Sequence, residues 1–185
     1  METDESRSFP RFLGPVLLDS SAIRKRVREL GSQITSDYTG KAPFLVVILK
    51  GASIFHADLV RSIQLDLAYD FMTVGSYGDS TASSGEVRIL KDLDQSLEGK
   101  DVLLIEDIVD TGLTMHYLMR TLKTRAPKSL KTVVLLNKPS RRKIDLSLDY
   151  VGFDIPDRFV VGYGLDYAQQ YRNLPDIRLL MECNT

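Results

Sequence analysis

Three short runs of apolar residues without a polar break constrain the fold of this chain more than any other feature. They are FLVVIL at 44–49, VLLI at 102–105 and TVVLL at 132–136. Strands that are uniformly apolar are typical of a parallel sheet covered on both faces. Between the second and third runs, Met115, Leu118, Met119 and Leu122 follow the spacing of one helix face. Strands that alternate with helices predict an α/β fold with a largely parallel sheet.

Weaker patterns complete this outline. We expect a helix that begins at Asp19 or Ser20 and carries Ile23, Val27, Leu30, Ile34 and Tyr38 on its apolar face. A second helix is indicated by Phe55, Leu59 and Ile63. Residues 76–85 are small and polar, which predicts a mobile loop. Further strands are expected at 67–74, 87–90, 149–153 and 159–163.

The chain has the size and charge of one soluble domain. Its 185 residues suit a single core, so we expect one domain over 1–185 with a disordered extension at 1–14. With 24 basic and 25 acidic residues the net charge is −1, which gives no general affinity for nucleic acid or for an anionic membrane. Neither a signal peptide nor a membrane span is indicated, and a single cysteine, Cys183, forms no disulfide framework. We therefore expect a cytoplasmic protein.

Two histidines, His56 and His116, fall in expected helices. Neither has a second His or Cys at ligand spacing, so we expect surface or boundary positions and no zinc site.

The segment 102–115, VLLIEDIVDTGLTM, carries the chemistry. A buried strand leads to Glu106 and Asp107, then to Asp110, and then to a turn over 111–114 before an amphipathic helix. Ligands of open α/β sheets bind at the carboxyl ends of strands. Free N–H groups at a helix start form a cradle for a phosphate. The acids are suited to sugar hydroxyls or to hydrated Mg²⁺.

Competing readings of these residues fit less well. A nucleotide-triphosphate loop requires Gly-Lys-Ser/Thr, whereas Leu113 follows Gly112. A phospho-acceptor receiver domain also pairs acids with a late lysine such as Lys138, but its acid pair follows the first strand. Gly162-Tyr163-Gly164 is a fragment of a dinucleotide fingerprint that lacks the third glycine.

Residues 105–114, IEDIVDTGLT, resemble the phosphoribosyl pyrophosphate motif of the type I phosphoribosyltransferases, and more narrowly of their hypoxanthine-guanine branch. The resemblance extends from about residue 15 to about residue 175, through LKGA at 49–52, SYG at 76–78, VRILKDLD at 87–94, LLNKPSRR at 135–142 and DYVGFDIPDRFVVGYGLDYAQQYRNLP at 149–175. It implies a type I phosphoribosyltransferase fold, in which helices flank a mainly parallel central sheet and the terminal segments build a small hood. It also implies Mg²⁺ as cofactor and a homodimer or homotetramer. The implied reaction is purine salvage: phosphoribosyl pyrophosphate and a 6-oxopurine base (hypoxanthine, and guanine as well) give the purine 5′-mononucleotide and pyrophosphate.

The resemblance also assigns roles to residues. Asp110 corresponds to the catalytic acid/base at purine N7, and the peptide before Lys50 corresponds to one that is often cis. Ser76 and Tyr77 correspond to the start of a loop that closes over the reaction centre. The implied metal ligands are Glu106, Asp107 and Asp166, and the implied base-binding residues are Ile108, Phe159, Val160 and Asp166. The implied residues for phosphoribosyl pyrophosphate and nucleotide are Lys50, Gly51, Ser76, Tyr77, Glu106, Asp107, Ile108, Val109, Asp110, Thr111, Gly112, Leu113, Thr114 and Arg172.

One position departs from the family pattern. Many members carry a lysine two residues before the Asp-Tyr-Val-Gly-Phe strand, where it donates to the purine 6-oxo group, but this chain has Ser147. The shorter Ser147 hydroxyl could donate through a water molecule, and Lys138 and Lys143 are the candidates to replace the lysine. Selectivity among hypoxanthine, guanine and xanthine therefore stays open. A non-catalytic sensor of phosphoribosyl pyrophosphate is the alternative from another class of protein.

Overall fold

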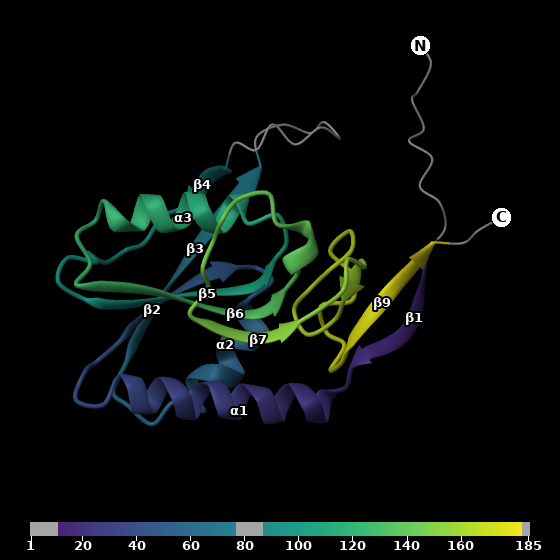
Figure 1. Cartoon of the computed structure of the whole chain (residues 1–185), viewed down its shortest axis with the longest axis horizontal. Helices are drawn as coiled ribbons and strands as arrows, with labels where there is room; N and C mark the ends of the chain where they lie inside the picture. Colours follow the sequence, from purple (N-terminus) through teal and green to yellow (C-terminus); the bar gives the residue numbers. More distant parts are fainter. Residues whose placement is uncertain (1–10, 77–86, 183–185) are drawn as a thin grey trace, which may run out of the picture.

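A six-stranded sheet with helices on both faces forms the body of the molecule (Figure 1). The computed structural model describes residues 11–76 and 87–182. The strand order is β4-β3-β2-β5-β6-β7, and every pairing is parallel except that of β3 with β4. The α/β fold expected from the sequence is confirmed. The sheet and its helices comprise α1 (Ser20–Asp37), β2 (Phe44–Leu49), α2 (Ser53–Val60), β3 (Ala68–Ser76), β4 (Val87–Lys91), β5 (Asp101–Val109), α3 (Leu113–Lys123), β6 (Ser129–Asn137) and β7 (Tyr150–Asp154).

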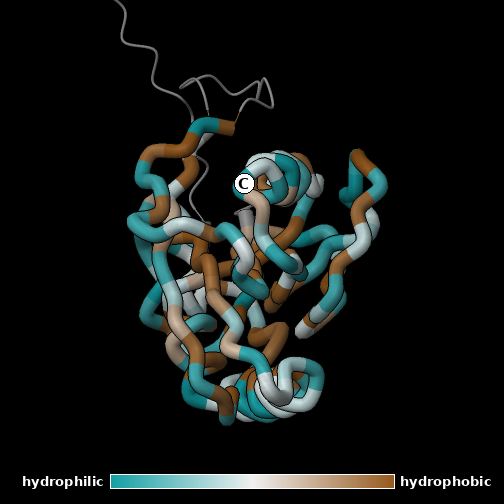
Figure 2. The backbone as a smooth tube through the Cα atoms, turned by 90° about the vertical axis from the view of Figure 1, so that its left-hand side faces the viewer, coloured by the Kyte–Doolittle hydropathy of each residue, from teal (hydrophilic) through white to brown (hydrophobic). Residues whose placement is uncertain are grey.

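The apolar runs fill both faces of this sheet, because successive side chains of a strand point to opposite sides. In β2, Leu45 and Val47 pack in the core beneath α1 and α2. Val46 and Ile48 pack in the core beneath α3. Figure 1 shows α1 on one side of the sheet and α3 on the other, and in Figure 2 the apolar stretches run through the interior between them. Burial on both faces explains why the middle of each of these strands is almost entirely apolar.

Helix α1 begins where the sequence predicts. Asp19 caps it, and its Oδ1 accepts hydrogen bonds of 2.8 Å from both Ser21 N and Ala22 N. Such a cap satisfies N–H groups that have no partner within the helix, which stabilises the helix by about 1 kcal/mol.

A second sheet, the hood, joins the two ends of the described chain. Its order is β1 (Arg11–Leu18), β9 (Ile177–Glu182) and β8 (Val160–Val161), all antiparallel. Within the extension expected at 1–14, Arg11, Phe12 and Leu13 pair with β9. The strand expected at 159–163 is reduced to two residues, since the chain turns at Gly162 with a φ of +100°.

Strand β5 is longer than its apolar run. It pairs with β6 as far as Val109, opposite Asn137. Glu106 and Asp107 therefore lie within the strand rather than in the loop after it, and their backbones are fixed by the sheet.

The expected surface or boundary position is wrong for His56. It is only 5% exposed and packs edge-on against the rings of Tyr69 and Phe71 on β3. Burial lowers the pKa of His56, which keeps the ring neutral. His116 is exposed on α3, as expected.

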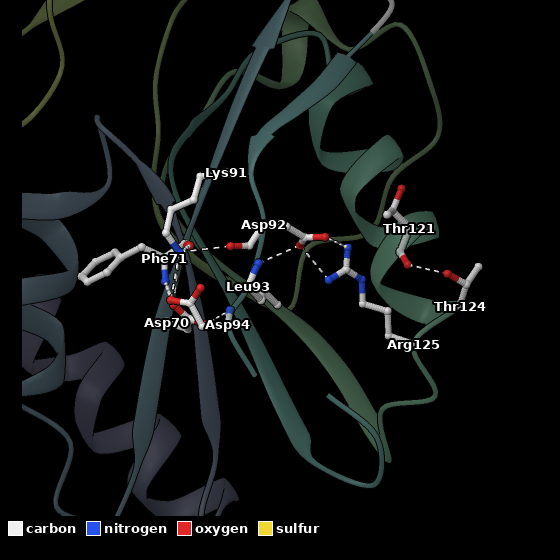
Figure 3. Close-up of polar contacts among 9 residues, drawn as sticks. All are labelled: Asp70, Phe71, Lys91, Asp92, Leu93, Asp94, Thr121, Thr124 and Arg125. Carbon is white, nitrogen blue, oxygen red and sulfur yellow. Dashed lines mark hydrogen bonds and ion pairs between the residues drawn. The ribbon is translucent and has the colours of Figure 1, made fainter. Parts of the chain in front are cut away.

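Polar side chains tie the β4 edge to its neighbours (Figure 3). Asp70 of β3 accepts hydrogen bonds of 2.7 Å from the backbone N–H groups of Phe71 and Asp94. Arg125, just beyond α3, makes two parallel bonds of 2.7 and 2.9 Å to the carboxylate of Asp92. We call Asp70, Lys91, Asp92, Asp94 and Arg125 the edge network.

No helix in the described ranges combines the length and the apolar character needed to cross a membrane.

Candidate active site

The turn between β5 and α3 forms an open cradle. Gly112 caps α3 with a φ of +85°, and no side chain caps this end. A long bond of 3.4 Å joins Leu113 N to Thr111 Oγ1. The remaining N–H groups of the first turn are therefore available to an anion. A cavity of about 110 Å³ lies here and is lined by Glu106, Ile108, Val109, Asp110, Thr111, Gly112, Thr114 and Met115.

A partly buried arginine, Arg142, supports this turn from behind. A Cβ at Gly112 would lie 2.9 Å from Arg142 Nη1, so the guanidinium packs directly on the turn. Arg142 donates to Asn137 Oδ1, while its buried Nη1 has no hydrogen-bond partner among the described residues. Lys143 N donates to Thr111 O at 3.0 Å. The loop after β6 thus holds the cradle in place.

Glu106 and Asp107 have unusual electrostatics. Burial, and then the neighbouring Asp107 carboxylate, raise the pKa of Glu106 well above its usual value. Burial raises the pKa of Asp107 to about 6, against a lowering contribution from the N–H of Ile108 and from Arg172. Two adjacent carboxylates in poorly solvated surroundings attract a cation or hydroxyl donors.

Asp107 lies against the backbone of the loop after β2. A Cβ at Gly51 would come within 1.7 Å of Asp107 Oδ2, so only glycine fits at this position. A Cβ at Gly164 would lie 2.1 Å from Gly51 O. The peptide between Leu49 and Lys50 is cis, as the resemblance implies. Three segments distant in sequence therefore meet at Gly51.

A second cavity, of about 260 Å³, opens beside the first and shares Ile108 and Asp110 with it. Phe159 is 48% exposed, although its place in an apolar sequence would normally bury it. Its ring meets that of Tyr167 edge to face, 5.8 Å between centroids. The cavity is lined by Asp107, Ile108, Asp110, Lys138, Phe159, Val160, Leu165 and Asp166.

Asp110 lies where the two cavities meet and faces two cations. Lys138 Nζ is 3.5 Å from its Oδ2, and Arg141 Nε is 2.8 Å from its Oδ1. Lys138 is only 6% exposed, and Arg141 also reaches Asp157 at 3.3 Å. Neither residue has a definite role in the sequence analysis, although both lie in the LLNKPSRR segment that carries part of the resemblance.

The structure shows which side chains lie near the second cavity in place of the lysine that Ser147 replaces. Ser147 is exposed in the loop before β7 and does not line the second cavity, whereas Lys138 does. Lys143 is exposed. Of the two candidate replacements, Lys138 is therefore the one in position to face a ligand, so the cavity has a long charged donor after all.

Lys50, Asp166 and Arg172 meet at the far side of Gly51. Arg172 Nη2 lies 2.7 Å from Asp166 Oδ1, and Arg172 Nη1 donates to Gly164 O at 2.7 Å. Lys50 Nζ donates to Gln169 Oε1 at 3.3 Å. Of these two cations, Arg172 acts on Asp107 and lowers its pKa, whereas Lys50 is held at the side chain of Gln169.

Two expected site residues, Leu113 and Ser76, are placed differently from the rest. The side chain of Leu113 lies on the outer surface of α3 with His116 and Tyr117, so only its backbone belongs to the cradle. Ser76 ends β3, paired with Val87. Tyr77 and the loop expected at 76–85 lie outside the described residues, apart from Ser76 itself.

The carboxylates fit Mg²⁺ in number and in kind, because this ion binds oxygen ligands and commonly uses one or two carboxylates together with water and substrate phosphates. Glu106 and Asp107 meet this description. Both oxygens of Asp166 already have partners, Arg172 and Gln169 N. Within the described ranges, no group of three His, Cys, Asp or Glu side chains lies close enough together to hold a metal ion.

Comparisons with known proteins agree with this geometry. The model of the phosphoribosyl transferase domain matches residues 16–168. A hypoxanthine-guanine phosphoribosyltransferase of Bacillus subtilis is 56% identical over 165 residues, covering 89% of this chain and 92% of the relative. The crystal structure of a hypoxanthine phosphoribosyltransferase of Staphylococcus aureus is 51% identical with a TM-score of 0.87, covering 91% of this chain and 92% of that one. A Trypanosoma cruzi hypoxanthine phosphoribosyl transferase is 44% identical, also with a TM-score of 0.87, over 92% of each chain.

Fold and site together define a phosphoribosyltransferase, with an anion cradle at the end of a central strand and a second cavity under a hood. Given the identity and coverage of these relatives, the chain belongs to the hypoxanthine-guanine branch of the phosphoribosyltransferase family.

Proposed function

We propose that this protein is a purine salvage enzyme that transfers the 5-phosphoribosyl group of phosphoribosyl pyrophosphate to hypoxanthine, and also to guanine. The products are IMP or GMP and pyrophosphate. The observation that carries the proposal is Asp110, which lies between an anion cradle and a cavity with an exposed aromatic ring and a buried lysine.

The cradle supports binding of the 5′-phosphate. The N–H groups at the start of α3 and the hydroxyls of Thr111 and Thr114 would donate to it. Glu106 and Asp107 would accept hydrogen bonds from the ribose 2′ and 3′ hydroxyls. These contacts fix the ribose C1 carbon at the border between the two cavities, which orients it for reaction.

The second cavity would hold the base. Phe159 would stack on the purine, the Val160 backbone would meet the base edge beside Asp166, and Lys138 Nζ would donate to the 6-oxo group. The 6-amino group of adenine offers no acceptor there, so a buried lysine disfavours adenine.

The proposed reaction breaks the C1–O bond, and the electron pair leaves with pyrophosphate. Purine N9 attacks C1, and the Asp110 carboxylate takes the proton from N7. Such proton transfer contributes about 10²- to 10⁴-fold to the rate. Lys50 and Arg172 would offset the charge that grows on the leaving pyrophosphate.

We also propose Mg²⁺ as the cofactor, with Glu106 and Asp107 nearest to it and Asp166 close by. The bound ion would supply positive charge to the leaving pyrophosphate. A cytoplasmic homodimer or homotetramer is the form we expect, and light scattering would measure its mass.

A product assay tests the function. Purified protein with Mg²⁺ and phosphoribosyl pyrophosphate is offered hypoxanthine, guanine, xanthine and adenine in separate reactions, and nucleotides are resolved by chromatography. We expect nucleotide from hypoxanthine and guanine and none from adenine. Preference for xanthine would make it the true base. Retained binding of phosphoribosyl pyrophosphate without any nucleotide would reveal a sensor instead.

A further inference from the structure

The turn from Asp166 to Arg172 holds the Gln169 side chain on a backbone of positive φ. Tyr167 and Gln170 exchange backbone hydrogen bonds of 3.2 and 2.9 Å, which closes a two-residue tip formed by Ala168 and Gln169. Both tip residues have positive φ, +49° and +64°. Glycine and asparagine are usual in this conformation, and other residues tolerate it at a cost of about 1 kcal/mol or more each.

Contacts around the tip fix where Gln169 points. Its backbone N–H donates to Asp166 Oδ2 at 2.8 Å. Its side-chain oxygen, Oε1, accepts from Lys50 Nζ at 3.3 Å and from Arg172 Nη2 at 3.3 Å. Both neighbours are donors only, so the oxygen and not the amide nitrogen must face them. One neutral oxygen therefore joins two cations that lie far apart in the sequence.

These two cations are the ones that the proposed function assigns to the pyrophosphate, and the present inference rests on that assignment. The charge of Arg172 is already partly balanced by Asp166, at 2.7 Å. A neutral amide oxygen holds Lys50 and Arg172 side by side without removing more of their charge. A phosphate oxygen is a stronger acceptor than an amide oxygen and would replace it.

We propose that Gln169 is a positioning residue for pyrophosphate. Its amide oxygen occupies the place between Lys50 and Arg172 that a pyrophosphate oxygen takes on binding, and it must be uncharged. The neutral side chain orders Lys50 in advance, which reduces the entropy cost of binding.

A matched pair of substitutions tests the requirement for neutrality. Gln169→Glu adds a negative charge at the cations, whereas Gln170→Glu adds the same charge one residue further on in the same turn. The KM for inorganic pyrophosphate is measured in the reverse reaction with IMP and Mg²⁺. We expect Gln169→Glu to raise it at least about tenfold, an effect that shrinks in high salt. Gln170→Glu should stay within about twofold of the wild type.

A third variant separates positioning from charge. Gln169→Met keeps the length of the side chain and removes the acceptor, so we expect the KM for pyrophosphate to rise about two- to tenfold, independently of salt. The KM for hypoxanthine in the forward reaction should not change in any of the three variants. A general disturbance of the turn would raise the KM values of both substrates.

The outcomes separate this inference from the proposed function. Equal effects of the two glutamates, or a KM for pyrophosphate unchanged in Gln169→Glu, would overturn the role of Gln169 while the enzyme remains active. If the wild type makes no nucleotide, the proposed function fails instead. Titration calorimetry then measures the dissociation constant of inorganic pyrophosphate, in the presence of Mg²⁺, for the wild type and for the same variants.

Discussion

Two groups of acidic side chains, one on the central strand β5 and the other at the β4 edge of the same sheet, differ in their surroundings. Glu106 and Asp107 lie on the central strand β5, where burial raises the pKa of both. In the edge network, Asp92 faces Arg125, and this hydrogen-bonded cation lowers its pKa (Figure 3). The edge carboxylates have partners within the protein. The central pair has no cation paired with it as closely as Arg125 is with Asp92, so its oxygens can accept hydrogen bonds from a ligand or coordinate a cation. Acids that look similar in the sequence therefore differ in role.

Asp110 belongs to neither group, because it has cationic neighbours as the edge acids do and yet faces the cavities. Its substitution should give the largest effect. Asp110→Asn preserves the shape of the side chain and removes its basicity. Turnover should fall about 10²- to 10⁴-fold, while the dissociation constant of phosphoribosyl pyrophosphate changes little. Steady-state rates and calorimetry measure the two. Wild-type turnover in this variant would remove Asp110 from the mechanism.

A substitution of Lys138 tests whether this lysine, which is paired with Asp110, also binds the purine base. Lys138→Met should lower kcat/KM for hypoxanthine about ten- to a hundredfold, since a buried charged donor is lost, and should leave the KM for phosphoribosyl pyrophosphate unchanged. Lys143→Met, which alters an exposed lysine of the same loop, is the control. If both variants lose the same activity, the assignment of Lys138 to the 6-oxo group is wrong.

The raised pKa of Asp107 should be visible in the pH dependence of the free energy of unfolding. Its pKa is about 6 in the folded protein against a usual 3.8, so the folded state binds the proton more tightly. The free energy of unfolding therefore falls as the pH rises from about 4 to about 6. In buffer without Mg²⁺ or substrates, Asp107→Asn should be more stable than the wild type by about 1 to 3 kcal/mol at pH 7, and equally stable near pH 4. Urea denaturation at the two pH values checks this. If Asp107→Asn is less stable than the wild type at pH 7, the ionised Asp107 carboxylate does not destabilise the folded protein.

The edge network should give the smallest effect, with the opposite sign. Arg125→Ala removes the partner of a half-exposed Asp92, so the free energy of unfolding should fall by about 0.2 to 1 kcal/mol at pH 7. Since the pKa of Asp92 is lowered, its contribution is present at neutral pH and is lost as the pH falls below about 4. The same denaturation series measures it. Altered KM values in Arg125→Ala would show that the edge network also acts on the active site.

The sequence predicted what depends on local pattern. The buried strands, the Asp19 cap and the turn at 110–114 all follow from residue type and spacing, and the structure has them. What the sequence missed depends on distant contacts. The hood strand β1 pairs with β9 and leaves Phe12, Leu13 and Val16 exposed, so no buried stripe marks it. Lys138 was undervalued because its burial depends on segments that lie close only after folding.

The positions of functional side chains were the hardest to foresee. The approach of Asp107 to Gly51, and of Gly164 to the same residue, joins strand β5 to two loops, and no spacing in the sequence indicates it. Residue type indicated that Glu106 and Asp107 suit sugar hydroxyls or Mg²⁺, whereas the roles of Asp110 and Arg172 came from the resemblance; all four roles remain proposals.

The pairing of β1 with β9 has a consequence for synthesis. Phe12 lies opposite Met181, so the hood cannot assemble until the chain has left the ribosome at least as far as β9. The central sheet and the phosphate cradle, which end by residue 154, need no later segment for their strand pairing. Phe159 and Val160 reach the base cavity only with the hood. A nascent chain therefore has a place for a phosphate before it has one for a purine, and its site is complete only once β9 has been synthesised and has paired with β8.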